Sequence, residues 1–169
     1  MKKIGLFYGS NLGATEEVAH LFKIHLKDRV EIHNIAYSSA DDLEKYDNLI
    51  LGLSTWGYGD PQDDWQFFLE ENTSLNLAGK NVAIFGLGDQ DAHHDVFVNG
   101  MGHLYNYILK TNAKIVGQWP TEGYSYGSET TAVVEGKFVG LPIDEINQPN
   151  LTKERVRNWI DKILEKFEG

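Results

Sequence analysis

The chain has 169 residues, a formal net charge of −10 and no cysteine. The length suits one domain, which we place at 1–169, and the absence of cysteine excludes disulfides, thiolate metal sites, iron–sulfur clusters and a cysteine nucleophile. The negative charge disfavours nucleic acid and anionic membranes and suits docking against a basic protein, although acidity can also serve solubility alone.

The N-terminal segment leads directly into a short apolar run that contains glycine and lacks a small-residue cleavage site, so it does not fit a signal peptide. No run of about 18 apolar residues is present, so we expect no transmembrane helix. We therefore expect a cytoplasmic protein. Without cysteine, any redox chemistry must come from a bound organic cofactor.

Apolar runs alternate with helical patterns along the chain. The runs predict strands at 4–8, 30–35, 48–53, 81–85 and 114–119. Apolar residues at helical spacing predict helices over 63–71 and 96–110, and two more that begin after the N-caps Thr15 and Thr152. This alternation predicts an α/β, doubly wound, five-stranded parallel sheet.

The segment 120–140 breaks the alternation because it is rich in glycine and has no helical period. We expect it to be an insertion beside the fifth strand that contains a small hairpin. Ligands of doubly wound sheets bind outside the carboxyl ends of the strands. Three polar or glycine-rich segments follow strand ends and should converge there, namely 9–15, 54–61 and 86–95.

The first of these loops is Ser10-Asn11-Leu12-Gly13-Ala14-Thr15. Backbone N–H groups between a strand and a helix point at a common centre, and the helix dipole adds positive potential. The sequence lacks the Gly-Lys-Ser/Thr of nucleoside-triphosphate loops and the glycine spacing of the dinucleotide fingerprint. One cluster of donors suits one terminal phosphate, and an ordinary strand-to-helix turn is the alternative.

The other two loops supply ring-binding and polar groups. Trp56 and Tyr58 lie among glycines, where aromatic rings serve stacking or recognition unless they fold back over the sheet. Asp89 and Gln90 offer hydrogen-bonding groups to the edge of a heterocycle. His93 and the adjacent histidine have no second cluster that would complete a metal site. The three loops together predict a mononucleotide pocket for a flat ring.

The chain resembles the flavodoxins of the long-chain type along its whole length. The resemblance rests on 3–10, Thr55-Trp56, Gly88-Asp89-Gln90 and 136–141, and the segment 120–140 is similar to the long-chain insertion. It implies a flavodoxin-like three-layer sandwich. It also implies a low-potential one-electron carrier with non-covalent FMN and no catalytic acid, base or nucleophile.

The resemblance implies that Trp56 stacks on the inner face of the isoalloxazine, that Asp89 contacts the pyrimidine edge, and that His93 takes the outer-face position where the family has tyrosine. The FMN-binding residues predicted in this way are Ser10, Asn11, Leu12, Gly13, Ala14, Thr15, Ser54, Thr55, Trp56, Gly57, Tyr58, Gly59, Leu87, Gly88, Asp89, His93, Val96, Phe97 and Val98.

Three of these positions have particular consequences. Histidine can take a proton near neutral pH, so we hypothesise that protonated His93 stabilises the anionic reduced flavin. Leu12 replaces a threonine whose hydroxyl usually bonds the phosphate, a loss of about 1 kcal/mol. Gly57 precedes Tyr58 where the family's peptide flips on reduction, and glycine favours the type II′ turn, which predicts a well-populated neutral semiquinone.

Such a carrier would be a monomer that docks redox proteins on the acidic surface near the flavin, such as a ferredoxin-NADP-type reductase, a pyruvate-linked oxidoreductase or nitrogenase. The main alternative is a flavin-dependent NAD(P)H or quinone reductase of the same fold, for which Trp56 and His93 leave little room. A response-regulator receiver would need acids after the first strand, where Tyr8-Gly9-Ser10 stand. The segment 123–127 matches a hydrolase nucleophile elbow but lacks the strand-turn-helix context.

Overall fold

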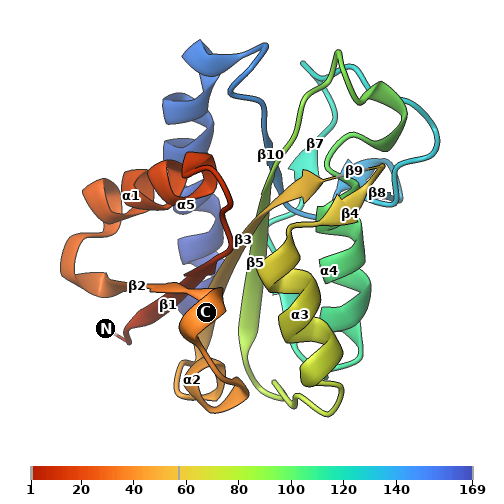
Figure 1. Ribbon diagram of the computed structural model, residues 1–169. Coiled ribbons are helices and arrows are strands. Elements are labelled where there is room, and N and C mark those ends of the chain that lie inside the picture. Colours follow the sequence, from red (N-terminus) through yellow and green to blue (C-terminus); the bar gives the residue numbers. More distant parts are fainter. Residues whose placement is uncertain (1, 57, 169) are drawn as a thin grey trace.

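The computed structural model describes residues 2–56 and 58–168, which fold around one mixed sheet (Figure 1). Its strands are β1 Ile4–Tyr8, β2 Val30–Asn34, β3 Asn48–Trp56, β4 Asp60–Pro61, β5 Asn81–Leu87, β6 Lys114–Val116 and β10 Leu141–Ile143. The main path runs β10-β5-β3-β1-β2, and every pair on it is parallel. The predicted doubly wound α/β fold is therefore confirmed.

The fifth position of the sheet is shared by two short strands, which the sequence did not predict. β6 pairs with the first half of β5, from Asn81 to Ala83, and β10 pairs with the second half, from Phe85 to Leu87. The predicted strand 114–119 is thus too long, because the chain leaves the sheet after Val116. Pro142 is tolerated in β10 because this is an edge strand, where a missing N–H breaks no inner ladder.

The helices cover both faces of the sheet. They are α1 Ala14–Leu26, α2 Ala40–Glu44, α3 Asp63–Glu71, α4 Asn99–Leu109 and α5 Thr152–Glu168, with 3₁₀ turns at Lys27–Arg29, Ile35–Tyr37, His94–Val96 and Pro149–Leu151. Figure 1 shows α1 and α5 on one face and α3 and α4 on the other. In the described ranges, no helix combines the length and apolar character needed to cross a bilayer.

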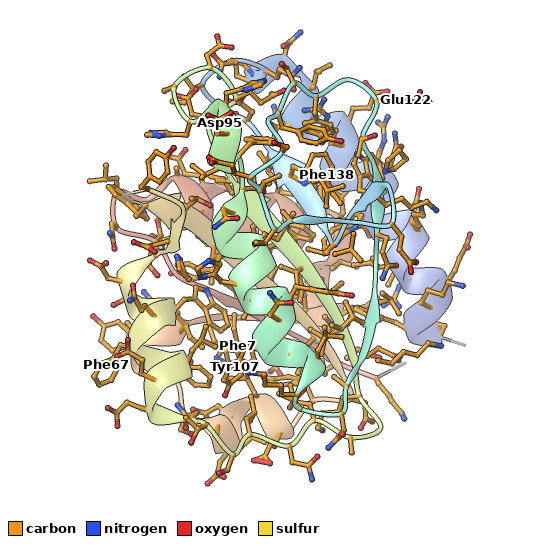
Figure 2. The ribbon with its side chains drawn as sticks, turned by 90° about the vertical axis from the view of Figure 1, so that its right-hand side faces the viewer. Phe7, Phe67, Asp95, Tyr107, Glu122 and Phe138 are labelled. Atoms are coloured by element: carbon orange, nitrogen blue, oxygen red, sulfur yellow. The ribbon has the colours of Figure 1, made fainter. Side chains whose placement is uncertain are left out.

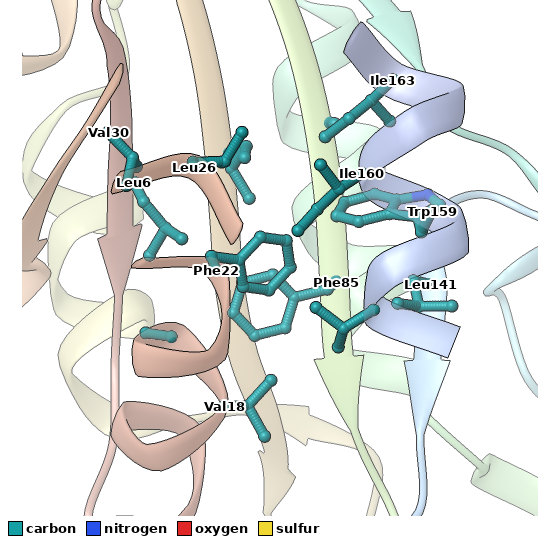
Figure 3. Packing of buried hydrophobic residues seen from close by; sticks show 14 of the residues in the cluster. Leu6, Val18, Phe22, Leu26, Val30, Phe85, Leu141, Trp159, Ile160 and Ile163 are labelled. Atoms are coloured by element: carbon teal, nitrogen blue, oxygen red, sulfur yellow. The ribbon is translucent and has the colours of Figure 1, made fainter. Parts of the chain in front are cut away.

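The core beneath α1 and α5 is built around stacked aromatic rings (Figure 3). The rings of Phe22 and Phe85 stack at 5.0 Å between centroids, and Trp159 meets Phe22 edge-on at 5.8 Å. Phe22 comes from α1, Phe85 from β5 and Trp159 from α5. Burial of these large rings fixes both helices against the sheet.

The predicted insertion contains the expected hairpin. It packs against the second hydrophobic core, which lies on the α3 and α4 side of the sheet. The strands β8 Val133–Val134 and β9 Lys137–Phe138 pair antiparallel, and β7 Trp119–Pro120 joins them on the other side of β9. Figure 2 labels Phe138, the second residue of β9, in this segment. Its ring lies 5.1 Å from that of Tyr124 and 6.0 Å from that of Phe97. The insertion therefore has its own aromatic anchor in the core.

Three predicted helix starts are wrong by a few residues. α1 is capped by Gly13, at φ 91°, so Thr15 lies inside the helix. Thr152 is the first residue of α5, and its buried Oγ1 has no hydrogen-bond partner. The predicted helix 96–110 begins only at Asn99, because Val98 has a left-handed backbone at φ 48°. Local residue spacing does not locate a helix start to the residue.

Candidate functional site

A cleft of about 460 Å³ opens at the carboxyl ends of the parallel strands. This volume lies within the range of typical small-ligand sites. The residues that line it are Ser10, Asn11, Leu12, Ala14, Thr15, Ser54, Thr55, Trp56, Leu87, Gly88, Asp89, His93, Glu145 and Ile146. The three loops predicted to converge do meet here, and a fourth loop that follows β10 joins them.

The first loop ends on a helix N-terminus that faces the cleft. Gly13 adopts the left-handed conformation that brings the chain into α1, and its N–H donates to Ser10 Oγ at 2.9 Å. Since α1 begins at Ala14, the amides of the next residues lack intrahelical acceptors. No lysine or arginine stands between Ser10 and Thr15, so the donors that this loop can offer to an anion are backbone amides and neutral side chains.

The second loop differs from the expected free loop. β3 continues to Trp56, because Thr55 and Trp56 pair antiparallel with Pro61 and Asp60. The indole Nε1 of Trp56 donates to Ser54 Oγ at 2.9 Å, while the ring stays 37 % exposed. Trp56 is thus held on a hairpin with its ring free to cover a ligand.

Asp89 lines the cleft and also holds the turn of the third loop. Its Oδ1 accepts hydrogen bonds from the amides of Asp91 and Ala92 and from the side chain of Asn147. These bonds, the Ala92 amide first and then Asn147, lower the pKa of Asp89. The backbone of Gly88 and Asp89 is thereby fixed beside the cleft.

Gln90 does not offer its side chain to the cleft as the sequence predicts. Its side chain is buried, not offered to a ligand, and Nε2 donates to Asp144 and Gln148. Its Oε1 accepts from the amide of Ser125 in the insertion at 2.7 Å. Gln90 therefore joins the third loop to the insertion.

Several other predicted site residues do not line the cleft. Phe97 and Val98 are buried in the core behind Gly88, where a Cβ at Gly88 would come within 3.0 Å of either side chain. Val96 is also buried outside the lining, so none of these three side chains lines the cleft. Gly13, Tyr58 and Gly59 lie outside the lining as well, with Tyr58 exposed. Gly57 lies outside the described residues.

Glu145 and Ile146 follow β10 and line the cleft, although neither was predicted from the sequence. An apolar run at 141–143 followed by polar residues was the signal available for them. The lining includes two carboxylates, Glu145 and Asp89. None of the lining residues is a lysine or an arginine, so the cleft carries negative charge. A negatively charged wall opposes the addition of further negative charge to a bound ligand.

The hydrolase pattern at 123–127 does not form a triad. Ser125 Oγ lies 3.1 Å from His94 Nε2, but the His94 Nδ1 to Asp95 Oδ1 distance of 3.6 Å exceeds a hydrogen bond and all three side chains are solvent-accessible. The elbow geometry of a strand, a turn and a helix is absent around Ser125 in the described chain. Within the same residues, no group of three or more His, Cys, Asp or Glu is arranged for a metal ion.

Comparison with known proteins gives a consistent family signal. The family model described as Flavodoxin matches residues 6–159. The chain is 42% identical over 168 residues to a flavodoxin of Klebsiella pneumoniae, covering 99% of this chain and 96% of that protein. Its identity to a flavodoxin of Synechococcus elongatus is 42% over 169 residues, covering 99% of each. The crystal structure of Fusobacterium nucleatum flavodoxin bound to flavin mononucleotide superposes with a TM-score of 0.93 at 36% identity, covering 99% of each chain.

Proposed function

The chain belongs to the flavodoxin family, and we propose that it binds one FMN non-covalently in the cleft and carries single electrons between redox proteins at low potential. The observation that carries the proposal is the junction of an anion-binding helix N-terminus and an aromatic ring in one cleft. The helix N-terminus suits a phosphate group, and the aromatic ring suits a flat heterocycle.

The residues that line the cleft suit each part of FMN: the phosphate, the ring system and the polar edge of the ring. The loop Ser10 to Thr15 offers amide and hydroxyl donors and no cation, which suits one phosphate at close range. Trp56, Leu87 and Ile146 provide apolar surface for the ring system. Backbone groups at Gly88 and Asp89, held in place by the Asp89 turn, suit the polar edge of the ring.

The protein's own part in the reaction is to bind, orient and tune. When bound, the flavin supplies the one-electron chemistry. Trp56 covers one side of the ring and limits the access of water. Glu145 and Asp89 disfavour additional negative charge next to them, which makes the bound flavin harder to reduce. None of these roles needs an acid, a base or a nucleophile, and we propose that the protein is not an enzyme.

A flavin-dependent NAD(P)H or quinone reductase of the same fold would need a second open site beside the ring. Trp56 and His93 both line the cleft, which supports a covered ring instead. We therefore prefer the carrier. Docking of reductases or oxidoreductases on the acidic face near the cleft, action as a monomer and a cytoplasmic location remain predictions from the sequence.

The proposal is tested by titrating the apoprotein with FMN and riboflavin and following the flavin fluorescence. We expect one FMN per chain, tighter binding of FMN than of riboflavin, and release of intact FMN on denaturation. The loaded yellow protein should turn blue on partial reduction. Rapid two-electron oxidation of NADPH by the purified protein would instead favour the reductase.

A further inference from the structure

Gln62 is a fully buried glutamine that links three elements around the cleft without lining it. It precedes α3 and caps it, since its Oε1 accepts from the amide of Trp65 at 3.2 Å. The main-chain N–H of Gln62 donates to the main-chain carbonyl of Ser54 at 2.9 Å. Its Nε2 donates to Asn11 Oδ1 at 2.7 Å and to Asp64 Oδ2 at 2.8 Å.

These partners leave the Gln62 amide only one orientation. The Trp65 amide can only donate, so the atom that faces it must be the carbonyl oxygen Oε1. The Asp64 carboxylate only accepts when ionised, so the atom that faces it must be Nε2. Both constraints agree, and Nε2 is therefore a donor toward the first loop.

The orientation of Gln62 in turn fixes that of Asn11. Because Gln62 Nε2 donates, Asn11 must present its oxygen to Gln62. Its amide nitrogen is then left with two N–H donors on a side chain that lines the cleft. A reversed Asn11 would present an oxygen there, which an anion repels.

This orientation matters because the side-chain donors that line the cleft near the first loop are neutral hydroxyls and the Asn11 amide. The loop has no cationic side chain, and Leu12 carries no hydroxyl. The nearby Glu16 and Glu17 oppose an anion. A neutral amide held in the donating orientation therefore adds to the hydroxyls of Ser10 and Thr15 as a side-chain donor for a phosphate.

We propose that Gln62 is a positioning residue for phosphate recognition, which acts through Asn11 and selects the phosphorylated over the unphosphorylated flavin. The inference rests on the proposed function, since it assumes that the cleft binds a flavin. It adds a specificity determinant that lies behind the cleft and does not touch the ligand.

The test uses Gln62→Glu, which keeps the acceptor for Trp65 and the side-chain volume but cannot donate to Asn11. Asn11 then turns its amide nitrogen toward residue 62 and its oxygen toward the phosphate. Dissociation constants for FMN and riboflavin are measured by fluorescence quenching on the full-length apoprotein. The FMN affinity should fall about 10- to 100-fold and the riboflavin affinity should change by less than about twofold.

Two further variants separate positioning from charge and from folding. Gln66→Glu adds the same charge at an exposed position one turn along α3 and should leave the ratio of the two affinities unchanged. Gln62→Met adds no charge and frees Asn11 to turn either way, so the FMN affinity should fall by a smaller factor, about 2- to 10-fold. It also covers the case in which Gln62→Glu fails to fold beside Asp64.

A double-mutant cycle with Asn11→Ala decides whether the effect passes through Asn11. In the Asn11→Ala protein, Gln62→Glu should have little further effect on the ratio of the FMN affinity to the riboflavin affinity. An undiminished effect in that background would overturn the inference, as would equal losses of FMN and riboflavin affinity. If the unaltered protein binds neither flavin, or does not prefer FMN, it is the proposed function that fails.

Discussion

Gln90 and Asp144 are joined by two hydrogen bonds to a single carboxylate oxygen. The main-chain N–H of Gln90 donates to Asp144 Oδ2 at 3.0 Å, and its Nε2 donates to the same atom at 2.8 Å. Asp144 also accepts from the amides of Ile146 and Asn147. This fully buried carboxylate therefore connects the loop after β5 to the loop after β10, and both loops line the cleft.

Replacing Asp144 by asparagine should destabilise the protein by about 1–3 kcal/mol at neutral pH, because buried donors lose a charged acceptor. Burial alone raises the pKa of Asp144, but donation from Asn147 and Gln90 outweighs it and the pKa is lowered. A carboxylate with a lowered folded-state pKa stabilises the fold above its unfolded-state value of about 3.9 and loses this effect as the pH falls through the folded value. The difference in the free energy of unfolding between wild type and Asp144→Asn should thus be constant near neutral pH and become smaller below about pH 4.

Urea unfolding at a series of pH values measures that difference. Asp91→Asn is the matched control, because Asp91 lies exposed in the same loop. Its free energy of unfolding should follow the wild type throughout. A gap between Asp144→Asn and wild type that persists unchanged at pH 3 would contradict the assigned role of the carboxylate.

Gly9→Ala should destabilise the protein by about 1–3 kcal/mol, through overpacking. A Cβ at this position would lie 2.1 Å from Gln62 Oε1 and 2.7 Å from Trp65 Cδ1. Both neighbours are fully buried, so neither can move aside freely. The displacement of Gln62 should also weaken FMN binding more than riboflavin binding. Urea unfolding and flavin titration check the two effects, and an unaltered midpoint would refute the first.

Leu12→Thr should bind FMN about 2- to 10-fold more tightly, because it restores one hydrogen-bond donor beside the phosphate. Leu12 lines the cleft and its side chain is 84% exposed, so the change removes little packing. Riboflavin affinity should stay the same. Equal gains for both flavins would mean that the hydroxyl acts elsewhere than at the phosphate.

His93→Tyr should reduce the pH dependence of the potential at which the bound flavin takes its second electron. A positive charge on a histidine beside the ring would favour the anionic reduced cofactor, whereas a tyrosine carries no such charge. His93 lines the cleft, whereas the adjacent His94 contacts Ser125 outside it. His94→Tyr is therefore the control in the spectroelectrochemical titration. Identical slopes for His93→Tyr and wild type would remove His93 from the explanation.

Glu145→Gln should raise the same potential by about 10–40 mV, the equivalent of a partly exposed charge interaction of about 0.2–1 kcal/mol. Glu145 is one of the two carboxylates in the cleft lining. The shift should shrink at high ionic strength, because salt screens the interaction. Glu154→Gln, at an exposed position on α5 outside the cleft, should leave the potential unchanged.

The sequence by itself determined the alternation of strands and helices, the anion-binding loop and the ring of Trp56. These features are local: apolar runs predict buried strands, and small polar residues between a strand and a helix predict an anion site. The starts of α1 and α4 were not determined by the sequence, since Gly13 and Val98 have left-handed backbones that no periodicity predicts.

Only the tertiary structure decided which distant residues support the cleft. It divided the fifth strand position between β6 and β10, because two separate segments can pair with the two halves of β5. It also turned Gln90 inward to Asp144 and set Gln62 against Asn11, across 54 and 51 positions of sequence. A buried polar group must find a hydrogen-bond partner, and the fold rather than the neighbouring sequence supplies it.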